Sequence, residues 1–119
     1  MIRIKALASL VDKDSGLVDI GTDHALLPIY LYENEITKKV TGSDISSNAL
    51  EFAKNNLKKH NLSDKIKLIV SDGFTNLNDE YDTAVISGMG TDTIKKMRRL
   101  SINLEKEENI IFSLIFLTF

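Results

Sequence analysis

The sequence predicts one α/β domain: a parallel sheet of about five strands with helices packed on both faces. Strand-like and helix-like patterns alternate along the chain, which is typical of parallel strands joined by helical crossovers. The stretch Leu17–Ile20, which is apolar apart from Asp19, leads into Gly21, so the first strand ends in a tight turn that starts a helix. Each of the first four predicted strands is followed by an acid or a glycine, which places these residues together at the carboxyl edge of the sheet.

The elements follow in order from the apolar spacing. We expect a short amphipathic helix over 2–11, and further helices over about 24–32, 49–60 and 93–102. The predicted strands are 17–20, 39–45, 66–70, 83–87 and 109–115. Pro28 falls inside the second helix, which therefore either starts late or bends. We expect the strand order 3-2-1-4-5, which leaves 109–115 at an edge. Because that strand carries no gatekeeping charge, we expect self-association there or a partner that covers the edge.

The composition is that of a globular protein, with 119 residues, 43% of them hydrophobic and 27% charged. Cysteine is absent, which excludes disulfides and thiolate metal sites, and no metal site is predicted. The net charge of −2 gives no global attraction to nucleic acid or to an anionic membrane. The first residues lack a secretory core and the apolar C-terminal run is too short for a bilayer, so we expect a cytoplasmic protein with no membrane partner.

The turn after the first strand differs from a dinucleotide fingerprint. That fingerprint reads Gly-x-Gly-x-x-Gly, whereas here Gly21 stands alone and Asp23 occupies the second glycine position. Aspartate tolerates left-handed backbone angles, but its carboxylate repels a pyrophosphate and attracts a positive group. The plain alternative is an ordinary Asp-Gly-type loop that binds nothing.

Acids at the strand ends indicate a nucleoside ligand. Asp44 follows Gly21 by 23 residues, the spacing at which an acid after the second strand binds ribose hydroxyls. Asp72 and Gly73 offer a side-chain acceptor and a main-chain amide, which suit adenine. With Asp19 and Asp23 also at this crevice, and no basic residue to offset the acids, we expect the cationic S-adenosylmethionine rather than NAD. A dehydrogenase is accordingly disfavoured.

The segment from Asp19 to Leu31, together with Ser43-Asp44-Ile45, Ser71-Asp72-Gly73 and Ser87-Gly88-Met89-Gly90, resembles the bacterial TrmK family. These are tRNA (adenine-22-N1)-methyltransferases with the Rossmann-like class I fold, and the resemblance covers about residues 2 to 100. It implies an S-adenosylmethionine pocket at the strand ends and a loop for the target base after the fourth strand. The implied cofactor residues are Asp19, Gly21, Thr22, Asp23, His24, Asp44, Ile45, Asp72 and Gly73, and the implied catalytic loop is Gly88, Met89 and Gly90.

The chain departs from this family at its C-terminal side. Thr91 replaces the last glycine of Gly-Met-Gly-Gly, and Phe112–Phe116 stands where members carry a Gln-Pro-Asn segment. We expect a truncated N-terminal catalytic part without the family's C-terminal helical domain, or a tail that shifts into an unrelated reading frame after about Glu108. We expect cofactor binding with weak or absent tRNA methylation by these residues alone. The alternative is a cofactor-binding remnant that depends on a partner for any catalysis.

Two further features have two interpretations each. His24 begins a helix beside the turn, where it serves either as a neutral base or as a structural residue that fixes the loop. The basic residues of the helix over 93–102 either neutralise tRNA phosphates or form a plain solvent face; they are Lys95, Lys96, Arg98 and Arg99. Methyl transfer to adenine N1 requires an unpaired base and mainly its alignment with the methyl donor.

Overall fold

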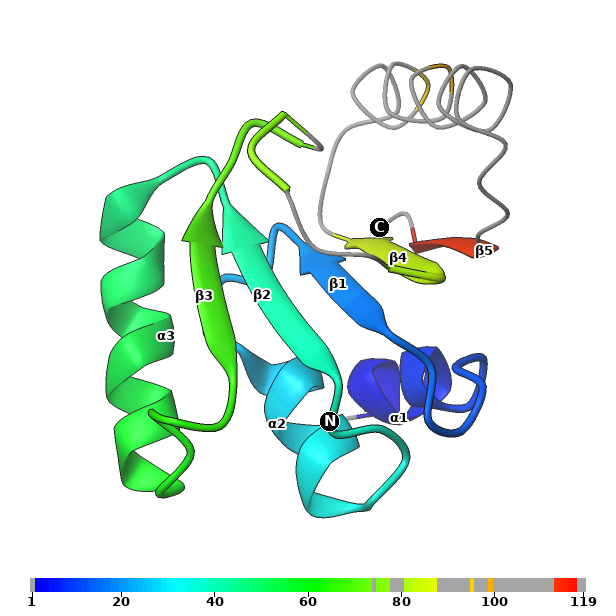
Figure 1. Ribbon diagram of the computed structural model, residues 1–119, viewed down its shortest axis with the longest axis horizontal. Coiled ribbons are helices and arrows are strands. Elements are labelled where there is room, and N and C mark those ends of the chain that lie inside the picture. Colours follow the sequence, from blue (N-terminus) through cyan, green and yellow to red (C-terminus); the bar gives the residue numbers. More distant parts are fainter. Residues whose placement is uncertain are drawn as a thin grey trace.

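The computed structural model describes residues 2–73, 75–77, 81–87 and 113–117, and Lys95 and Arg99 as single residues. Five parallel strands form one sheet in the order β3-β2-β1-β4-β5 (Figure 1), which confirms the predicted topology. The strands are β1 (Leu17–Ile20), β2 (Val40–Asp44), β3 (Lys67–Val70), β4 (Thr83–Ser87) and β5 (Ser113–Leu117). The helices are α1 (Ile2–Ala8), α2 (Leu26–Glu33) and α3 (Ser47–Lys59).

One hydrophobic core joins the three helices to the sheet. Helix α1 packs on α2, α2 packs on β2, and α3 packs on β2 and β3. Leu17 of β1, Val40 of β2 and Val85 of β4 belong to the same cluster of buried side chains as the helix residues Leu7, Ala8, Leu27, Ile29, Leu31, Leu50, Ala53 and Leu57. Side chains alternate along a strand, so these sheet residues define the face that the three helices cover.

Strand β1 is buried on both faces. Leu17 belongs to the helix-covered core, and Val18 and Ile20, which alternate with it, are equally buried. Such two-sided burial is typical of the central strand of a parallel sheet and explains why the predicted strand is nearly continuous in apolar residues. The helix predicted over 93–102 lies outside the described residues apart from Lys95 and Arg99, which are helical and exposed.

The ends of α2 and α3 agree with their sequence signals. Helix α2 begins at Leu26, which places Pro28 in the first turn, where its missing N–H has no intrahelical partner to lose. The late start is therefore the correct one of the two predicted alternatives. Ser46 is the N-cap of α3, and its Oγ accepts a hydrogen bond from the Ala49 N–H at 3.2 Å.

Strand β5 differs from its predicted bounds. It ends at Leu117, two residues beyond the predicted end, and pairs with all five residues of β4. Residues 109–112, the first part of the predicted strand, lie outside the described residues. The sequence from 110 to 119 is almost wholly apolar, so no turn residue marks the boundary and the pairing with β4 sets it. Strand β5 ends the sheet in the described part of the chain, as predicted.

The described helices include none that is both long and apolar enough to cross a membrane.

Candidate functional site

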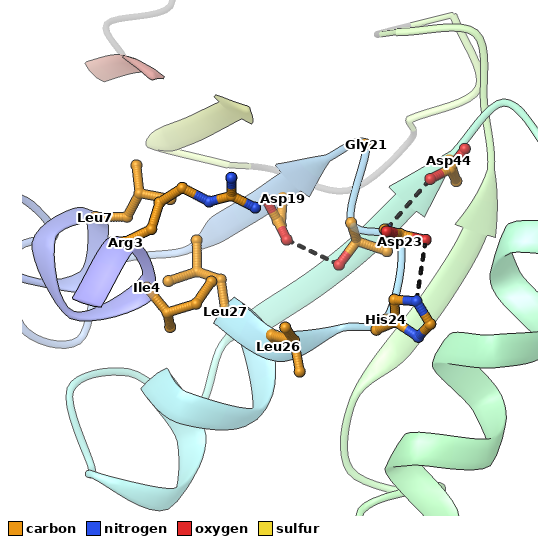
Figure 2. A pocket seen from close by; sticks show the side chains of 11 residues that line it. Arg3, Ile4, Leu7, Asp19, Gly21, Asp23, His24, Leu26, Leu27 and Asp44 are labelled. Atoms are coloured by element: carbon orange, nitrogen blue, oxygen red, sulfur yellow. Dashed lines mark hydrogen bonds and ion pairs between the residues drawn. The ribbon is translucent and has the colours of Figure 1, made fainter. Parts of the chain in front are cut away.

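A pocket of about 340 Å³ lies at the carboxyl ends of β1 and β2 (Figure 2), within the size range of small-molecule sites. Its walls come from α1, from the turn between β1 and α2, from the start of α2 and from the end of β2. The lining residues are Arg3, Ile4, Leu7, Asp19, Gly21, Thr22, Asp23, His24, Leu26, Leu27 and Asp44. The pocket therefore occupies the place where open α/β sheets bind their ligands.

The turn that forms its floor has an unusual backbone. Gly21, Asp23 and Ala25 all have positive φ angles, of 77°, 54° and 60°. Glycine adopts this conformation freely and aspartate tolerates it, but an alanine there costs on the order of 1 kcal/mol or more. Left-handed residues of this kind concentrate at ligand sites, because the surrounding structure must hold them in place.

Two neighbouring elements hold the turn. The N–H groups of Gly21 and Thr22 both donate to the Ser43 carbonyl oxygen of β2, each at 2.9 Å. From α3, the Asn56 side-chain amide donates to the His24 carbonyl oxygen at 2.8 Å. The turn is thus fixed to β2 and α3 at once by hydrogen bonds within the chain.

Asp19 is the buried acid of the site, only 3% exposed. Its Oδ2 accepts a hydrogen bond from the Thr22 hydroxyl at 2.8 Å, while its Oδ1 is buried without a hydrogen-bond partner among the described residues. Burial raises the pKa of Asp19 from 3.8 to about 7; the nearby Asp44 adds to the rise, and the Thr22 hydrogen bond opposes it. Asp19 therefore carries only a partial negative charge near pH 7.

Asp44 is held by main-chain donors at the end of β2. The Asp23 N–H donates to its Oδ2 at 3.3 Å, and the Ser46 N–H donates to its Oδ1 at 3.2 Å. A carboxylate offers about four acceptor positions, so each oxygen keeps one for a ligand. The side chain is thereby oriented in advance for a pair of hydroxyl donors.

His24 is half-exposed at the rim of the pocket. Its Nε2 lies 3.8 Å from the Asp23 Oδ1, and its ring packs on Phe52 of α3 with centroids 5.3 Å apart. Its main-chain carbonyl receives the Asn56 hydrogen bond already described. These contacts are those of a residue that fixes the loop, and they leave the ring at the pocket wall.

Gly42 explains how closely β2 approaches the turn. A Cβ at this position would lie 3.0 Å from the Thr22 side chain and 3.0 Å from the Leu68 Cδ2. Glycine at position 42 therefore leaves the room that Thr22 needs to reach Asp19.

The structure brings six of the predicted cofactor residues into one pocket: Asp19, Gly21, Thr22, Asp23, His24 and Asp44. The other three do not line it. Ile45 follows β2 and is 68% exposed, while Asp72 is exposed and Gly73 buried in the turn after β3. That turn is anchored by Ser71, whose N–H donates to the Asp44 carbonyl oxygen and whose hydroxyl donates to the Gly73 carbonyl oxygen.

Several predicted residues lie outside the described part of the chain. These are the loop Gly88, Met89 and Gly90 and two of the four basic residues, Lys96 and Arg98. Lys95 and Arg99 are described as helical and exposed.

The sequence predicts four acids and no basic residue around the crevice, and the structure corrects both points. Asp72 does not line the pocket with the other three acids, and a basic residue, Arg3 of α1, does line it. Sequence reasoning missed Arg3 because only tertiary packing brings α1 against the turn. A signal was present: Arg3 lies four residues before the core residue Leu7, on the same side of the helix.

Comparisons with known proteins agree with this geometry. A family model described as a methyltransferase domain matches residues 1–115. A putative tRNA methyltransferase from Mycoplasma pneumoniae is 40% identical over 93 residues, which cover 74% of this chain and 42% of that protein. The resemblance to the TrmK family that the strand-end motifs indicated is confirmed.

Two solved structures share the fold. The structure of M. capricolum TrmK with S-adenosylhomocysteine superposes with a TM-score of 0.75 at 34% identity, covering 83% of this chain and 46% of that one. A putative tRNA methyltransferase of the 1-methyladenosine-22 type from Streptococcus pneumoniae, in complex with S-adenosylmethionine, gives a TM-score of 0.80 at 27% identity, covering 88% and 50%. The chain thus spans about half the length of the relatives it matches or less.

Proposed function

The chain belongs to the methyltransferase-domain family, and from this premise we propose that it binds S-adenosylmethionine in the pocket and serves methyl transfer to N1 of adenine 22 in tRNA. The observation that carries the cofactor assignment is Asp44. Its two oxygens are each fixed by a main-chain N–H and each keep an acceptor position, which matches the two hydroxyls of a ribose.

The charges of the pocket support S-adenosylmethionine over a dinucleotide. When bound, this cofactor supplies an electrophilic methyl group on a sulfonium cation. Asp23 and Asp44 attract such a cation and repel a pyrophosphate. The repulsion between two like charges about 4 Å apart is about 4 kcal/mol at an effective dielectric constant of about 20. Glycine at position 21 lets the backbone approach the cofactor closely.

The adenine end is assigned to residues beside the pocket. We place it near Ile45, whose exposed side chain offers an apolar surface, and near Asp72 and Gly73, which lie in the turn after β3. Asp72 suits the exocyclic amine as an acceptor, and the Gly73 N–H suits a ring nitrogen.

The substrate assignment rests on the relatives, whose names specify tRNA methylation. Adenine N1 lies on the pairing edge, so the base must be unpaired to react, and the protein contributes chiefly by aligning it with the methyl group. We assign the base to the loop Gly88–Gly90 and tRNA phosphates to Lys95, Lys96, Arg98 and Arg99, as the sequence resemblance and the basic charges suggest. A tRNA substrate also implies a cytoplasmic location.

The proposal is tested with labelled S-adenosylmethionine and unmodified tRNA transcripts, followed by nucleoside analysis for 1-methyladenosine. A control transcript carries uridine in place of adenosine 22. We expect incorporation that is slow, because the four basic residues assigned to tRNA neutralise at most a few phosphates, and that disappears with the control transcript. Cofactor binding with no incorporation at saturating enzyme would instead favour the alternative of a cofactor-binding domain that needs a partner to act.

A further inference from the structure

We propose that Asn56 of α3 is a positioning residue for the cofactor. Its side-chain amide donates to the His24 carbonyl oxygen and so holds the turn after β1 in the shape that orients Asp44 for the ligand. This inference rests on the proposed function, because the ligand concerned is the one assigned to the pocket. Asn56 does not line the pocket, so it acts through the turn and not by contact with the ligand.

The Asn56 hydrogen bond falls at the most demanding point of the turn. His24 stands between Asp23 and Ala25, two residues with a side chain that adopt positive φ angles of 54° and 60°. Backbone of this kind persists only where the surrounding structure holds it. The bonded oxygen belongs to the peptide that joins His24 to Ala25, and the distance of 2.8 Å is that of a well-formed hydrogen bond. Asn56 therefore fixes a peptide between two unfavourable conformations.

Helix α3 contacts His24 in two different ways. Phe52 and Asn56 are four residues apart, so they lie on the same side of the helix. The Phe52 ring packs on the imidazole of His24 with centroids 5.3 Å apart, whereas Asn56 binds its main chain. A ring contact tolerates sliding, but a hydrogen bond specifies both distance and direction. The position of the turn relative to α3 is therefore set by Asn56.

The position of the turn matters because its backbone orients Asp44. The Asp23 N–H donates to the Asp44 Oδ2 at 3.3 Å, beyond the usual length of such a bond, so a small shift of the turn breaks it. The Asp44 carboxylate then keeps only the Ser46 N–H, on Oδ1, and gains freedom to rotate. A side chain that must be ordered when the ligand binds lowers the affinity. Loss of the Asn56 amide should thus weaken binding although no group that touches the ligand is removed.

The test is calorimetry with S-adenosylhomocysteine for the wild type, Asn56→Ala, Asn56→Gln and the control Asn55→Ala. Alanine removes the donor and favours a helix, whereas glutamine keeps an amide donor. Asn55 is the exposed neighbour in the same helix, so its variant controls for the change in helix propensity. The stoichiometry counts the folded chains, and the dissociation constant reports on the pocket within them.

We expect Asn56→Ala to raise the dissociation constant fivefold or more at unchanged stoichiometry. Asn56→Gln should recover part of the loss, and Asn55→Ala should stay within twofold of wild type. A lower stoichiometry with an unchanged dissociation constant would show that Asn56 only stabilises the fold, and no change in either quantity would show that the turn does not need it. Both results overturn the inference.

A second arm repeats Asn56→Ala in the Asp44→Ala background. The exchange should then raise the dissociation constant twofold or less, because the side chain that it positions is gone. The same fold-change in both backgrounds would show that Asn56 does not act through Asp44 and would also overturn the inference. All of these results leave the proposed function standing. A wild type that does not bind S-adenosylhomocysteine would refute the proposed function and the inference with it.

Discussion

Replacing Asp19 by asparagine is predicted to change how the stability of the chain depends on pH. In the folded protein, burial raises the pKa of Asp19 to about 7, with Asp44 adding to the rise and the Thr22 hydrogen bond opposing it. The unfolded chain loses this proton near pH 3.8. Between these values the folded state binds more protons than the unfolded state, so the free energy of unfolding falls as the pH rises and levels off above about 7.

The size of the effect follows from the two pKa values. Each pH unit between pH 3.8 and about pH 7 changes the free energy of unfolding by about 1.4 kcal/mol. Over this range the buried Asp19 therefore contributes about 4 kcal/mol in total. Roughly 3 kcal/mol of this lies between pH 5 and pH 8. The asparagine variant has no proton to exchange at this position and lacks this dependence, and its side-chain oxygen still accepts the Thr22 hydrogen bond.

Urea unfolding at pH 5 and pH 8 measures the effect as the difference in unfolding free energy between variant and wild type. For Asp19→Asn this difference should move in favour of the variant by roughly 3 kcal/mol from pH 5 to pH 8. Any constant cost of the new amide cancels in the comparison. The control Asp64→Asn alters an exposed acid in the turn before β3, and its difference should stay the same. Equal differences for Asp19→Asn at both pH values would refute the reasoning.

Other parts of the fold lead to three more predictions. Gly42→Ala should destabilise the chain by about 1–3 kcal/mol in urea unfolding, because the added Cβ displaces Thr22; an unchanged midpoint would contradict this packing. Removing two exposed cations, Lys95→Gln with Arg99→Gln, should reduce the slope of log affinity for tRNA against log salt by roughly 1 to 2, and an unchanged slope would mean that neither contacts phosphate. Strand β5 ends the described sheet, so light scattering should show self-association that grows with concentration; a monomer at all concentrations would count against it.

The strand order and the pocket could be predicted because local patterns specify them. Gly21 after an apolar strand and Asp44 after the next strand indicate a crevice at the carboxyl edge, whatever the details of packing. Ser46 and Pro28 likewise mark helix starts through their own backbone chemistry.

What the sequence did not predict depends on contacts between distant segments. The charge of Asp19 is set by its burial in the folded chain, which no local pattern reports, so the sequence alone predicts four anionic acids at the crevice. The position of Arg3 on the pocket wall depends on how α1 packs against the turn. The end of β5 depends on its pairing with β4, since its own residues are almost uniformly apolar.

The central claim is that this pocket binds S-adenosylmethionine rather than a dinucleotide. Calorimetry of the chain with S-adenosylhomocysteine and with NAD, for the wild type, Asp44→Ala and the exposed control Asp64→Ala, tests it most directly. We predict that S-adenosylhomocysteine binds, that Asp44→Ala weakens it at least tenfold because hydrogen bonds to a charged group contribute about 1.5–3 kcal/mol each, and that Asp64→Ala has no effect. NAD should show little binding to any of the three. Tighter binding of NAD than of S-adenosylhomocysteine by the wild type would contradict the account.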